Sequence, residues 1–244
     1  MQLHIYKNAD ELNEAFANWL INYINTTLQT QNKFTIALSG GNTPKKLNEL
    51  LASEKYKHKI DWTKLHFFWG DERFVPLNDE RNNAKMAFDT LLNCVSVIKE
   101  NIHIIQTENI TPEQSAKQYE NVLQQYFQET TFSFDLVLLG MGNDGHTLSL
   151  FPHQPVIQEN KKWVSSFWLE NQNMYRITLT ALIVNKAKCV TFLVTGSDKA
   201  TALKEVLEGE KNIDMFPSQI IKPEKGLLYW FVDEAAASLL SSNK

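Results

Sequence analysis

Short apolar runs alternate with helical patterns along this chain of 244 residues, and that alternation constrains the fold most strongly. Runs with strand character end at glycine or at polar residues, at 34–38, 65–69, 135–139, 163–167, 175–179, 189–194 and 227–232. Apolar residues at helical spacing occupy 9–29, 45–51, 82–93, 112–128 and 198–208. Asp10 is the expected cap of the first helix, and Asp233 that of a last short one. The pattern predicts an α/β fold with a mostly parallel sheet and helices on both faces.

Length and composition favour one globular domain spanning residues 1–244. We find no internal repeat and no Gly/Ser-rich linker, and we interpret the polar segment 209–225 as a long loop rather than a boundary. Hydrophobic residues make up 43% of the chain, which excludes the disordered class. The net charge of −4 argues against a general nucleic-acid binder.

Cysteine usage and the N-terminal residues indicate a reducing compartment. Cys94 and Cys189 lie far apart and share no metal-type spacing, so free thiols are the simplest interpretation. The first residues lack the basic and apolar regions of a secretory signal, and no apolar run is long enough to span a membrane. We expect a cytoplasmic protein without membrane contact.

Polar residues follow four of the predicted strands. They occupy Ser39–Thr43, Gly70–Arg73, Gly140–His146 and Thr195–Lys199. Because the carboxyl ends of parallel strands lie along one edge of a sheet, these four loops should converge on a common site.

The loop at 140–146 carries the residues best suited to proton transfer. Gly140, Gly142 and Gly145 allow positive φ angles or close approach to a ligand, and Asp144 and His146 lie among them. A histidine at the end of a buried strand, with a carboxylate two residues before it, is typical of a general acid or base. A purely structural histidine is the alternative.

The same glycines formally match a dinucleotide-binding pattern, which is a weak signal here. That fingerprint normally occupies the first strand–helix turn and needs an acidic residue about 20 positions later, and Glu159 does not end a strand. A serine hydrolase is disfavoured because Gly-x-Ser-x-Gly is absent. The six histidines show no metal-ligand spacing, so we expect no metal site.

A second loop has the features of an anion site. Ser39-Gly40-Gly41-Asn42-Thr43 joins a strand to a helix N-terminus, where free N–H groups and glycines accommodate phosphate. A tight turn with Thr43 as helix cap is the alternative, and the Walker A ending is absent. Arg73 suits phosphate recognition, or an ion pair with Asp71 or Glu72. Arg176 and Lys199 are further cationic candidates, each with a structural alternative.

Together these stretches resemble the 6-phosphogluconolactonase family. The resemblance rests on Ser39–Pro44, Gly70-Asp71-Glu72-Arg73, the block from Gly140 to Thr147 with Ser149–Pro152, Arg176–Thr180 and Val194-Thr195-Gly196 with Lys199, and it covers about residues 10–235. It implies a Rossmann-like fold shared with glucosamine-6-phosphate deaminases and ribose-5-phosphate isomerase. It also implies cofactor-free hydrolysis of 6-phosphogluconolactone to 6-phosphogluconate in the oxidative pentose phosphate pathway. The expected partner is that small sugar-phosphate lactone, and the expected state a monomer or weak homo-oligomer.

The resemblance leads to a specific hypothesis for the site. His146 activates water and Asp144 orients its ring. The residues expected to bind phosphate and sugar are Ser39, Gly40, Gly41, Asn42, Thr43, Arg73, Asn83, Arg176 and Lys199.

Two rival interpretations remain open at this point. The deaminase pattern has a glutamate near the position of Phe151, and a non-catalytic sugar-phosphate sensor would need only the anion site. One departure from the lactonase pattern is Asn82, where serine is usual.

Overall fold

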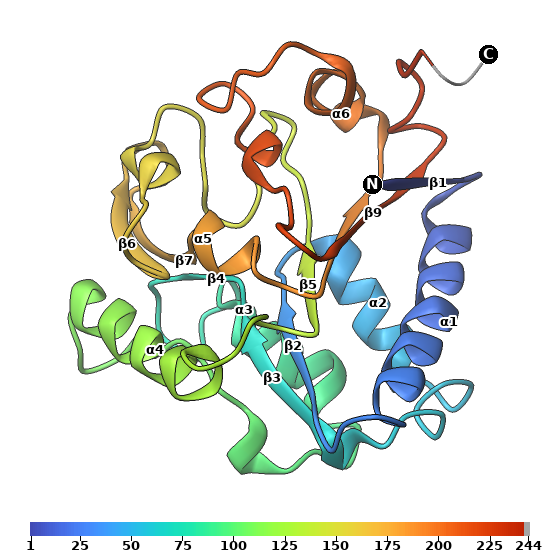
Figure 1. Cartoon of the computed structure of the whole chain (residues 1–244), viewed down its shortest axis with the longest axis vertical. Coiled ribbons are helices and arrows are strands. Elements are labelled where there is room, and N and C mark those ends of the chain that lie inside the picture. The colour runs from blue at the N-terminus through green and yellow to red at the C-terminus, as the bar shows by residue number, and fades with distance from the viewer. Residues whose placement is uncertain (242–244) are drawn as a thin grey trace.

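A six-stranded, entirely parallel sheet forms the centre of the computed structural model, which describes residues 1–241 (Figure 1). From edge to edge its strands are β1 (Gln2–Tyr6), β9 (Leu227–Asp233), β8 (Cys189–Val194), β5 (Leu136–Leu139), β2 (Phe34–Leu38) and β3 (Leu65–Trp69). The predicted α/β fold with a mostly parallel sheet is confirmed. The prediction omitted β1, an edge strand whose side chains are only partly buried and give no apolar run.

A second, antiparallel sheet was not predicted as a separate unit. It consists of β4 (Asp71–Arg73), β7 (Met174–Leu179) and β6 (Val164–Leu169). Gly70 joins the two sheets, because its N–H donates to the carbonyl of Leu38 at 2.9 Å and its carbonyl accepts from Leu179 N–H at 2.8 Å. A Cβ at Gly70 would lie 2.5 Å from Leu148 Cδ2, so this junction has no room for a side chain.

The principal helices occupy most of the predicted segments. They are α1 (Ala9–Thr27), α2 (Asn42–Ala52), α3 (Asn83–Ala87), α4 (Pro112–Phe127), α5 (Ala181–Val184) and α6 (Ala200–Glu208). α3 continues into a π-helical turn (Phe88–Leu92), and 3₁₀ turns include Ser197–Lys199 before α6 and Pro217–Ile220. None of the helices within residues 1–241 combines the length and apolar character needed to cross a bilayer.

Helix ends account for the local errors of prediction. Asn8, not Asp10, caps α1, because its side chain accepts from the N–H groups of Asp10 and Glu11. The expected last helix is a series of turns after β9, in which Asp233 accepts from Ala236 N–H. Thr111 and Gln114 form a capping box at the start of α4, which sets the beginning of that helix as predicted.

The order of the strands places a topological switch point between β2 and β5. The chain moves outward from β2 to the edge strand β3, and then returns to the other side of β2 to form β5. Right-handed crossovers therefore place α1 and α2 on one face and the later connections on the other. Figure 1 shows α1 and α2 side by side, with α4 on the opposite side of the molecule. Ligands of such sheets bind at the carboxyl ends of the strands beside the switch point.

Segment 209–225 packs against the glycine loop rather than standing free. Ser218 N–H donates to the carbonyl of Gly145 at 2.9 Å, and His153 N–H donates to that of Asp214 at 3.0 Å. His153 Nδ1 also lies 2.6 Å from Asp214 Oδ2. The segment therefore holds the 140–153 region in place from its outer side.

Tyr119 allows a test of the fold, because its hydroxyl group holds the end of the edge strand β3. Its buried hydroxyl accepts from Trp69 N–H at 2.7 Å and donates to the Trp69 carbonyl at 3.0 Å. Tyr119→Phe should lower the free energy of unfolding by about 1–3 kcal/mol, because both backbone groups would stay buried without this partner. Urea unfolding measures the change. Tyr175→Phe, on a partly exposed ring, is the control, and equal small effects of both substitutions would contradict the expectation.

Candidate active site

A cavity of about 470 Å³ lies where the four polar loops meet at the carboxyl edge of the sheet. Its walls include ten of the predicted residues, which are Ser39, Gly40, Gly41, Asn42, Thr43, Arg73, Asn83, His146, Arg176 and Lys199. The eleventh, Asp144, contacts the ring of His146 and is not part of the wall. Ser39 and Lys199, the first and last of these residues, are 160 positions apart in the sequence, and the fold brings them to one cavity.

His146 and Asp144 form a close pair inside the glycine loop. Nδ1 of His146 lies 2.5 Å from Oδ1 of Asp144, and that oxygen also accepts from the His146 N–H at 3.1 Å. Burial raises the pKa of Asp144, but the hydrogen bond and charge of His146 outweigh it, so the pKa lies below its ordinary value. Asp144 therefore remains ionised, and Nε2 is the nitrogen of His146 that can meet a bound molecule.

Gly142 makes this pairing possible. A Cβ at that position would lie 2.1 Å from Nδ1 of His146 and 2.5 Å from Oδ1 of Asp144. The N–H of Gly142 donates to the carbonyl of His146 at 2.8 Å, which closes the loop on itself. Gly145, with φ of +77°, supplies the left-handed turn between Gly142 and His146.

Phe151 fixes the plane of the His146 ring, a contact that sequence reasoning missed. The two ring centroids are 4.1 Å apart with an interplanar angle of 29°. The guanidinium carbon of Arg176 lies 5.5 Å from the same Phe151 ring. A Leu-Phe-Pro sequence after a turn looks like ordinary core, so only the fold reveals this arrangement.

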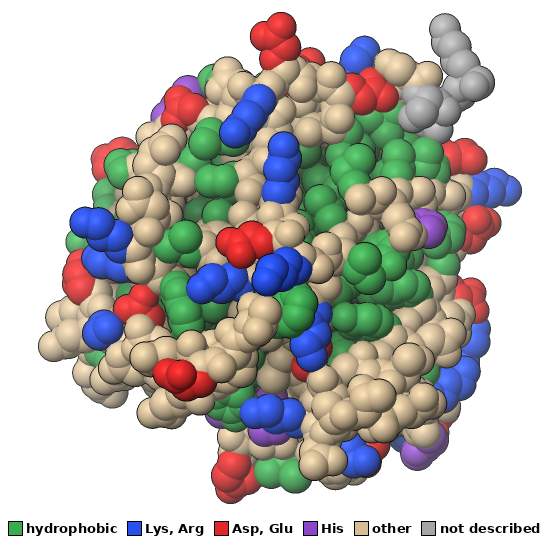
Figure 2. Space-filling model, viewed as in Figure 1, with side chains coloured by type: hydrophobic (Ala, Val, Ile, Leu, Met, Phe, Trp, Pro, Cys, Tyr) green, Lys and Arg blue, Asp and Glu red, His purple; other side chains and the backbone are tan. Residues whose placement is uncertain are grey.

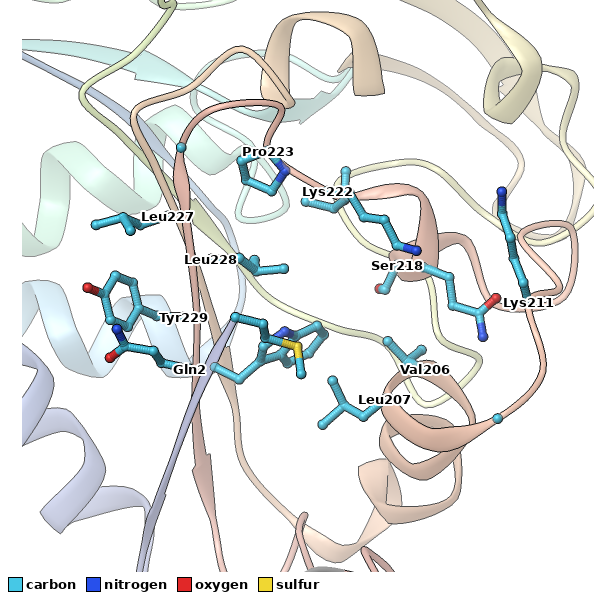
Figure 3. Close-up of a pocket in the computed structure, with 16 residues that line it drawn as sticks. Gln2, Val206, Leu207, Lys211, Ser218, Lys222, Pro223, Leu227, Leu228 and Tyr229 are labelled. Carbon is cyan, nitrogen blue, oxygen red and sulfur yellow. The ribbon is translucent and has the colours of Figure 1, made fainter.

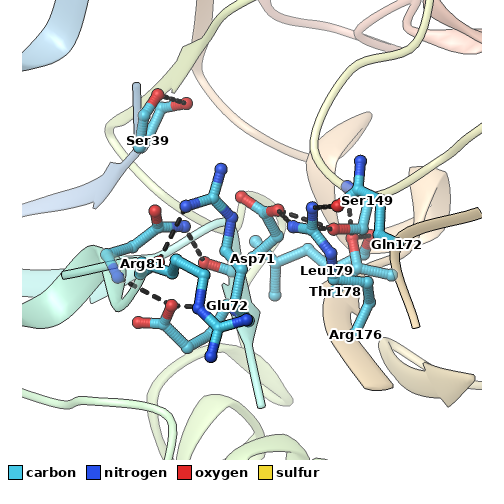
Figure 4. A network of polar contacts seen from close by, with 12 residues as sticks. Ser39, Asp71, Glu72, Arg81, Ser149, Gln172, Arg176, Thr178 and Leu179 are labelled. Carbon is cyan, nitrogen blue, oxygen red and sulfur yellow. Dashed lines mark hydrogen bonds and ion pairs between the residues drawn. The ribbon is translucent and has the colours of Figure 1, made fainter. Parts of the chain in front are cut away.

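A buried polar network holds Arg176 (Figure 4). Its Nη1 lies 3.5 Å from Asp71 Oδ2 and 3.3 Å from Ser149 Oγ, and its Nη2 donates to Gln172 Oε1 at 2.5 Å. Ser149 Oγ in turn donates to Asp71 Oδ2 at 2.6 Å. Burial and the charge of Arg73 lower the pKa of Arg176, while Asp71 opposes that change. Arg176 therefore supplies positive charge to the wall while protein groups occupy much of its hydrogen-bonding capacity.

Arg73 does not pair with its acidic neighbours. Its Nη1 donates to the carbonyl of Arg81 at 2.7 Å, and across residues 1–241 its guanidinium forms no ion pair with Asp71 or Glu72. The local ion-pair alternative is therefore wrong, and the charge of Arg73 is directed into the cavity wall.

Glu72 connects the strand that carries Arg73 to the helix that carries Asn83. Its carboxyl group is fully buried and accepts from the N–H groups of Arg73, Asn83 and Ala84 at 2.8, 2.7 and 2.9 Å. Burial raises its pKa to about 8, against the opposing effect of the three N–H donors. Sequence reasoning assigned Glu72 no role beyond a possible partner for Arg73.

Asn83 is held next to the glycine-rich loop. Its side-chain amide donates to the carbonyl of Asp71 at 2.9 Å, and its Oδ1 would lie 1.9 Å from a Cβ at Gly40. Glycine at position 40 therefore allows the loop after β2 to approach α3. This contact brings the Asn83 amide to the same wall as the start of α2.

The start of α2 presents backbone donors to the cavity. The helix begins at Asn42 after Gly41, whose φ is +103°, and no side chain caps it. Thr43 is therefore not the cap, and its hydroxyl instead lies 3.0 Å from that of Thr195 in the loop after β8. An uncapped first turn at a cavity wall is suited to an anion.

Lys199 completes the basic part of the wall. Its Nζ lies 2.9 Å from Oδ2 of Asp198, and their hydrogen bond lowers the pKa of that acid. The cavity thus combines three cationic side chains with one imidazole and a helix N-terminus. This combination can bind a phosphate and transfer a proton in the same space.

Comparison with known proteins gives a consistent result. The family model described as glucosamine-6-phosphate isomerases/6-phosphogluconolactonase matches residues 7–230. The 6-phosphogluconolactonase of Synechocystis sp. is 41% identical over 209 residues, covering 84% of each chain. That of Haemophilus influenzae is 40% identical over 205 residues, covering 84% of this chain and 87% of its own. The solved structure of the Trypanosoma brucei 6-phosphogluconolactonase superposes with a TM-score of 0.85 at 26% identity and covers 98% of both chains.

Glu72 gives a pH-dependent prediction. A carboxyl whose pKa is higher in the folded state binds more protons when folded, so its contribution to stability falls as pH rises from about 4.5 to about 8. Replacing Glu72 with glutamine, which does not titrate, should lower the free energy of unfolding most near pH 5. This loss should shrink by about 1 kcal/mol per pH unit toward pH 8. Urea unfolding of both proteins across this range measures the difference. A cost that is independent of pH would show that Glu72 does not retain its proton.

Proposed function

This chain belongs to the glucosamine-6-phosphate isomerase/6-phosphogluconolactonase family, and we propose that it hydrolyses 6-phospho-D-glucono-1,5-lactone to 6-phospho-D-gluconate. The observation that carries the proposal is that His146, Arg73, Arg176 and Lys199 line one cavity. The reaction is the one named for the relatives, and it serves the oxidative pentose phosphate pathway.

The catalytic step uses His146 as a general base. Nε2 takes a proton from water, and the oxygen attacks the lactone carbonyl carbon to give a tetrahedral oxyanion. The oxyanion then collapses, the bond between that carbon and the ring oxygen breaks, and the imidazolium returns its proton to the leaving oxygen. The resulting carboxylic acid ionises and releases one proton to solvent.

Asp144 keeps His146 in the form that this step requires. Its ionised carboxylate at 2.5 Å holds the proton on Nδ1, so that Nε2 is the accepting nitrogen, and it stabilises the imidazolium that forms. The N–H groups of Gly142 and Gly145 already donate within the loop, to His146 and Gly142. Other groups therefore meet the oxyanion.

The phosphate binds where the start of α2 and the cationic side chains line the cavity. The uncapped first turn of α2, Arg73, Arg176 and Lys199 supply donors and positive charge, and Asn83 contacts a sugar hydroxyl. Binding energy from this remote group positions the lactone carbonyl near His146.

One contact argues against the amino-sugar isomerase reaction of the same family. The resemblance gives those enzymes a glutamate near position 151, whereas here the Phe151 ring stacks on His146 and offers no carboxylate. Freshly prepared 6-phosphogluconolactone should give enzyme-dependent acid release above its spontaneous hydrolysis, and glucosamine 6-phosphate should not be converted. Binding of sugar phosphate without turnover would instead identify a sensor.

The general base is tested by His146→Asn. Removing a general base costs about 10²–10⁴-fold in kcat, measured as acid release from the lactone. His153→Asn is a matched control, because His153 also lies 2.6 Å from a carboxylate, that of Asp214, but outside the cavity. Turnover by His146→Asn within a few-fold of that control would remove His146 from this role.

The phosphate-binding role of Arg73 is tested by comparing two lactones. Arg73→Ala should lower kcat/KM for 6-phosphogluconolactone by about 10–100-fold, the worth of a charged hydrogen bond. It should change hydrolysis of glucono-1,5-lactone, which lacks the phosphate, by much less. Arg81→Ala, whose side chain pairs with Asp79 at the surface, controls for a general change in charge. Equal losses on both lactones would contradict a phosphate contact.

A further inference from the structure

A second cavity, of about 500 Å³, lies away from the candidate active site and shares none of its lining residues (Figure 3). It is bounded by β9 on one side and by α6 and the turn at Pro217–Ile220 on the other. Its apolar walls include Val206, Leu207, Ile221 and Leu228. The volume is in the range of cavities that hold metabolites or cofactors, about 300–1,000 Å³.

Two buried polar side chains in this wall have no hydrogen-bond partner. Ser218 and Trp230 are 1% and 2% exposed, and within residues 1–241 neither Oγ of Ser218 nor Nε1 of Trp230 is paired. Buried polar groups in folded proteins are normally satisfied, so unpaired ones beside a cavity indicate that something else supplies the partner. The indole N–H can only donate, which requires an acceptor on the ligand.

The charge of the walls is entirely positive. Among the described residues 1–241, Lys211 and Lys222 are the charged side chains of the lining, which includes no Asp or Glu. Figure 3 shows the Lys222 side chain extending toward Ser218 across the cavity. Figure 2 shows hydrophobic side chains gathered over β9 and the adjacent β1, with basic side chains nearby. An anionic group of a ligand would therefore contact Lys222 and Ser218, with apolar surface beside it.

We propose that this cavity binds a small organic anion with an apolar body, distinct from the sugar-phosphate substrate. The apolar side chains of the wall suit an apolar ligand body, while the lysines and the unpaired donors favour a carboxylate, sulfonate or phosphate on the ligand. The bound molecule would lie next to Ser218, whose N–H donates to Gly145, so the site adjoins the back of the glycine loop.

The test uses two fluorescent probes that share an apolar body and differ in charge. 8-Anilinonaphthalene-1-sulfonate carries the anionic group, and N-phenyl-1-naphthylamine lacks it. The wild-type protein should bind the sulfonate saturably at one site and more tightly than the neutral probe. An excess of 6-phosphogluconate should not displace it, which separates this cavity from the active site whether or not the protein is a lactonase.

Charge-reversal variants locate the site. The double variant Lys211→Glu, Lys222→Glu should lower the affinity for the sulfonate probe about tenfold, because two attractions become repulsions. It should change the affinity for the neutral probe by less than about twofold. Lys204→Glu combined with Lys225→Glu, exposed lysines outside the lining, should leave both probes unchanged. Unaltered thermal unfolding shows that each variant is folded.

Three outcomes would overturn the proposal. One is the absence of saturable sulfonate binding, and another is its displacement by 6-phosphogluconate. The third is that both probes bind with equal affinity and the lysine reversals leave that affinity unchanged. This result would identify an apolar contact surface for another protein.

Discussion

The carboxyl group of Glu72 is the constraint on which the rest of the cavity depends. It is completely buried and accepts three backbone N–H bonds, from the residue that follows it and from the first turn of α3. These bonds fix β4 against α3, so that Arg73 and Asn83 reach the same wall. Because the burial of a carboxyl group is costly, such a group persists where its hydrogen bonds define a geometry that apolar packing would not.

The glycine loop has its own support from the opposite side. Segment 209–225 contacts it through Ser218 and the ring of Phe216, which would lie 2.9 Å from a Cβ at Gly145. The loop is thus held between the parallel sheet and a turn that follows α6. In the general-base role proposed for His146, a loop fixed on both sides needs little reorganisation, which is how preorganised sites lower reaction barriers.

The sequence predicted the parallel sheet and the convergence of its polar loops, because strand and helix periodicities and glycine positions are local signals. It could not predict the antiparallel sheet, since β4 is a three-residue run of charged residues and its partner β7 lies about 100 positions away. The roles of Asp71, Ser149 and Gln172 were missed for the same reason. Each becomes meaningful only through contact with Arg176, and nothing in their local spacing indicates it. The position of segment 209–225 likewise depends on tertiary contacts.

The benzene ring of Phe151 has consequences for how charge is accommodated at the centre of the cavity. It stacks on the imidazole of His146, and the guanidinium carbon of Arg176 lies 5.5 Å from its centroid. Both faces of an aromatic ring carry negative electron density, so each can attract a cation. If His146 gains a proton during turnover, its positive charge appears on an aromatic surface that attracts it. Two cationic groups can thus share one neutral ring that itself never titrates.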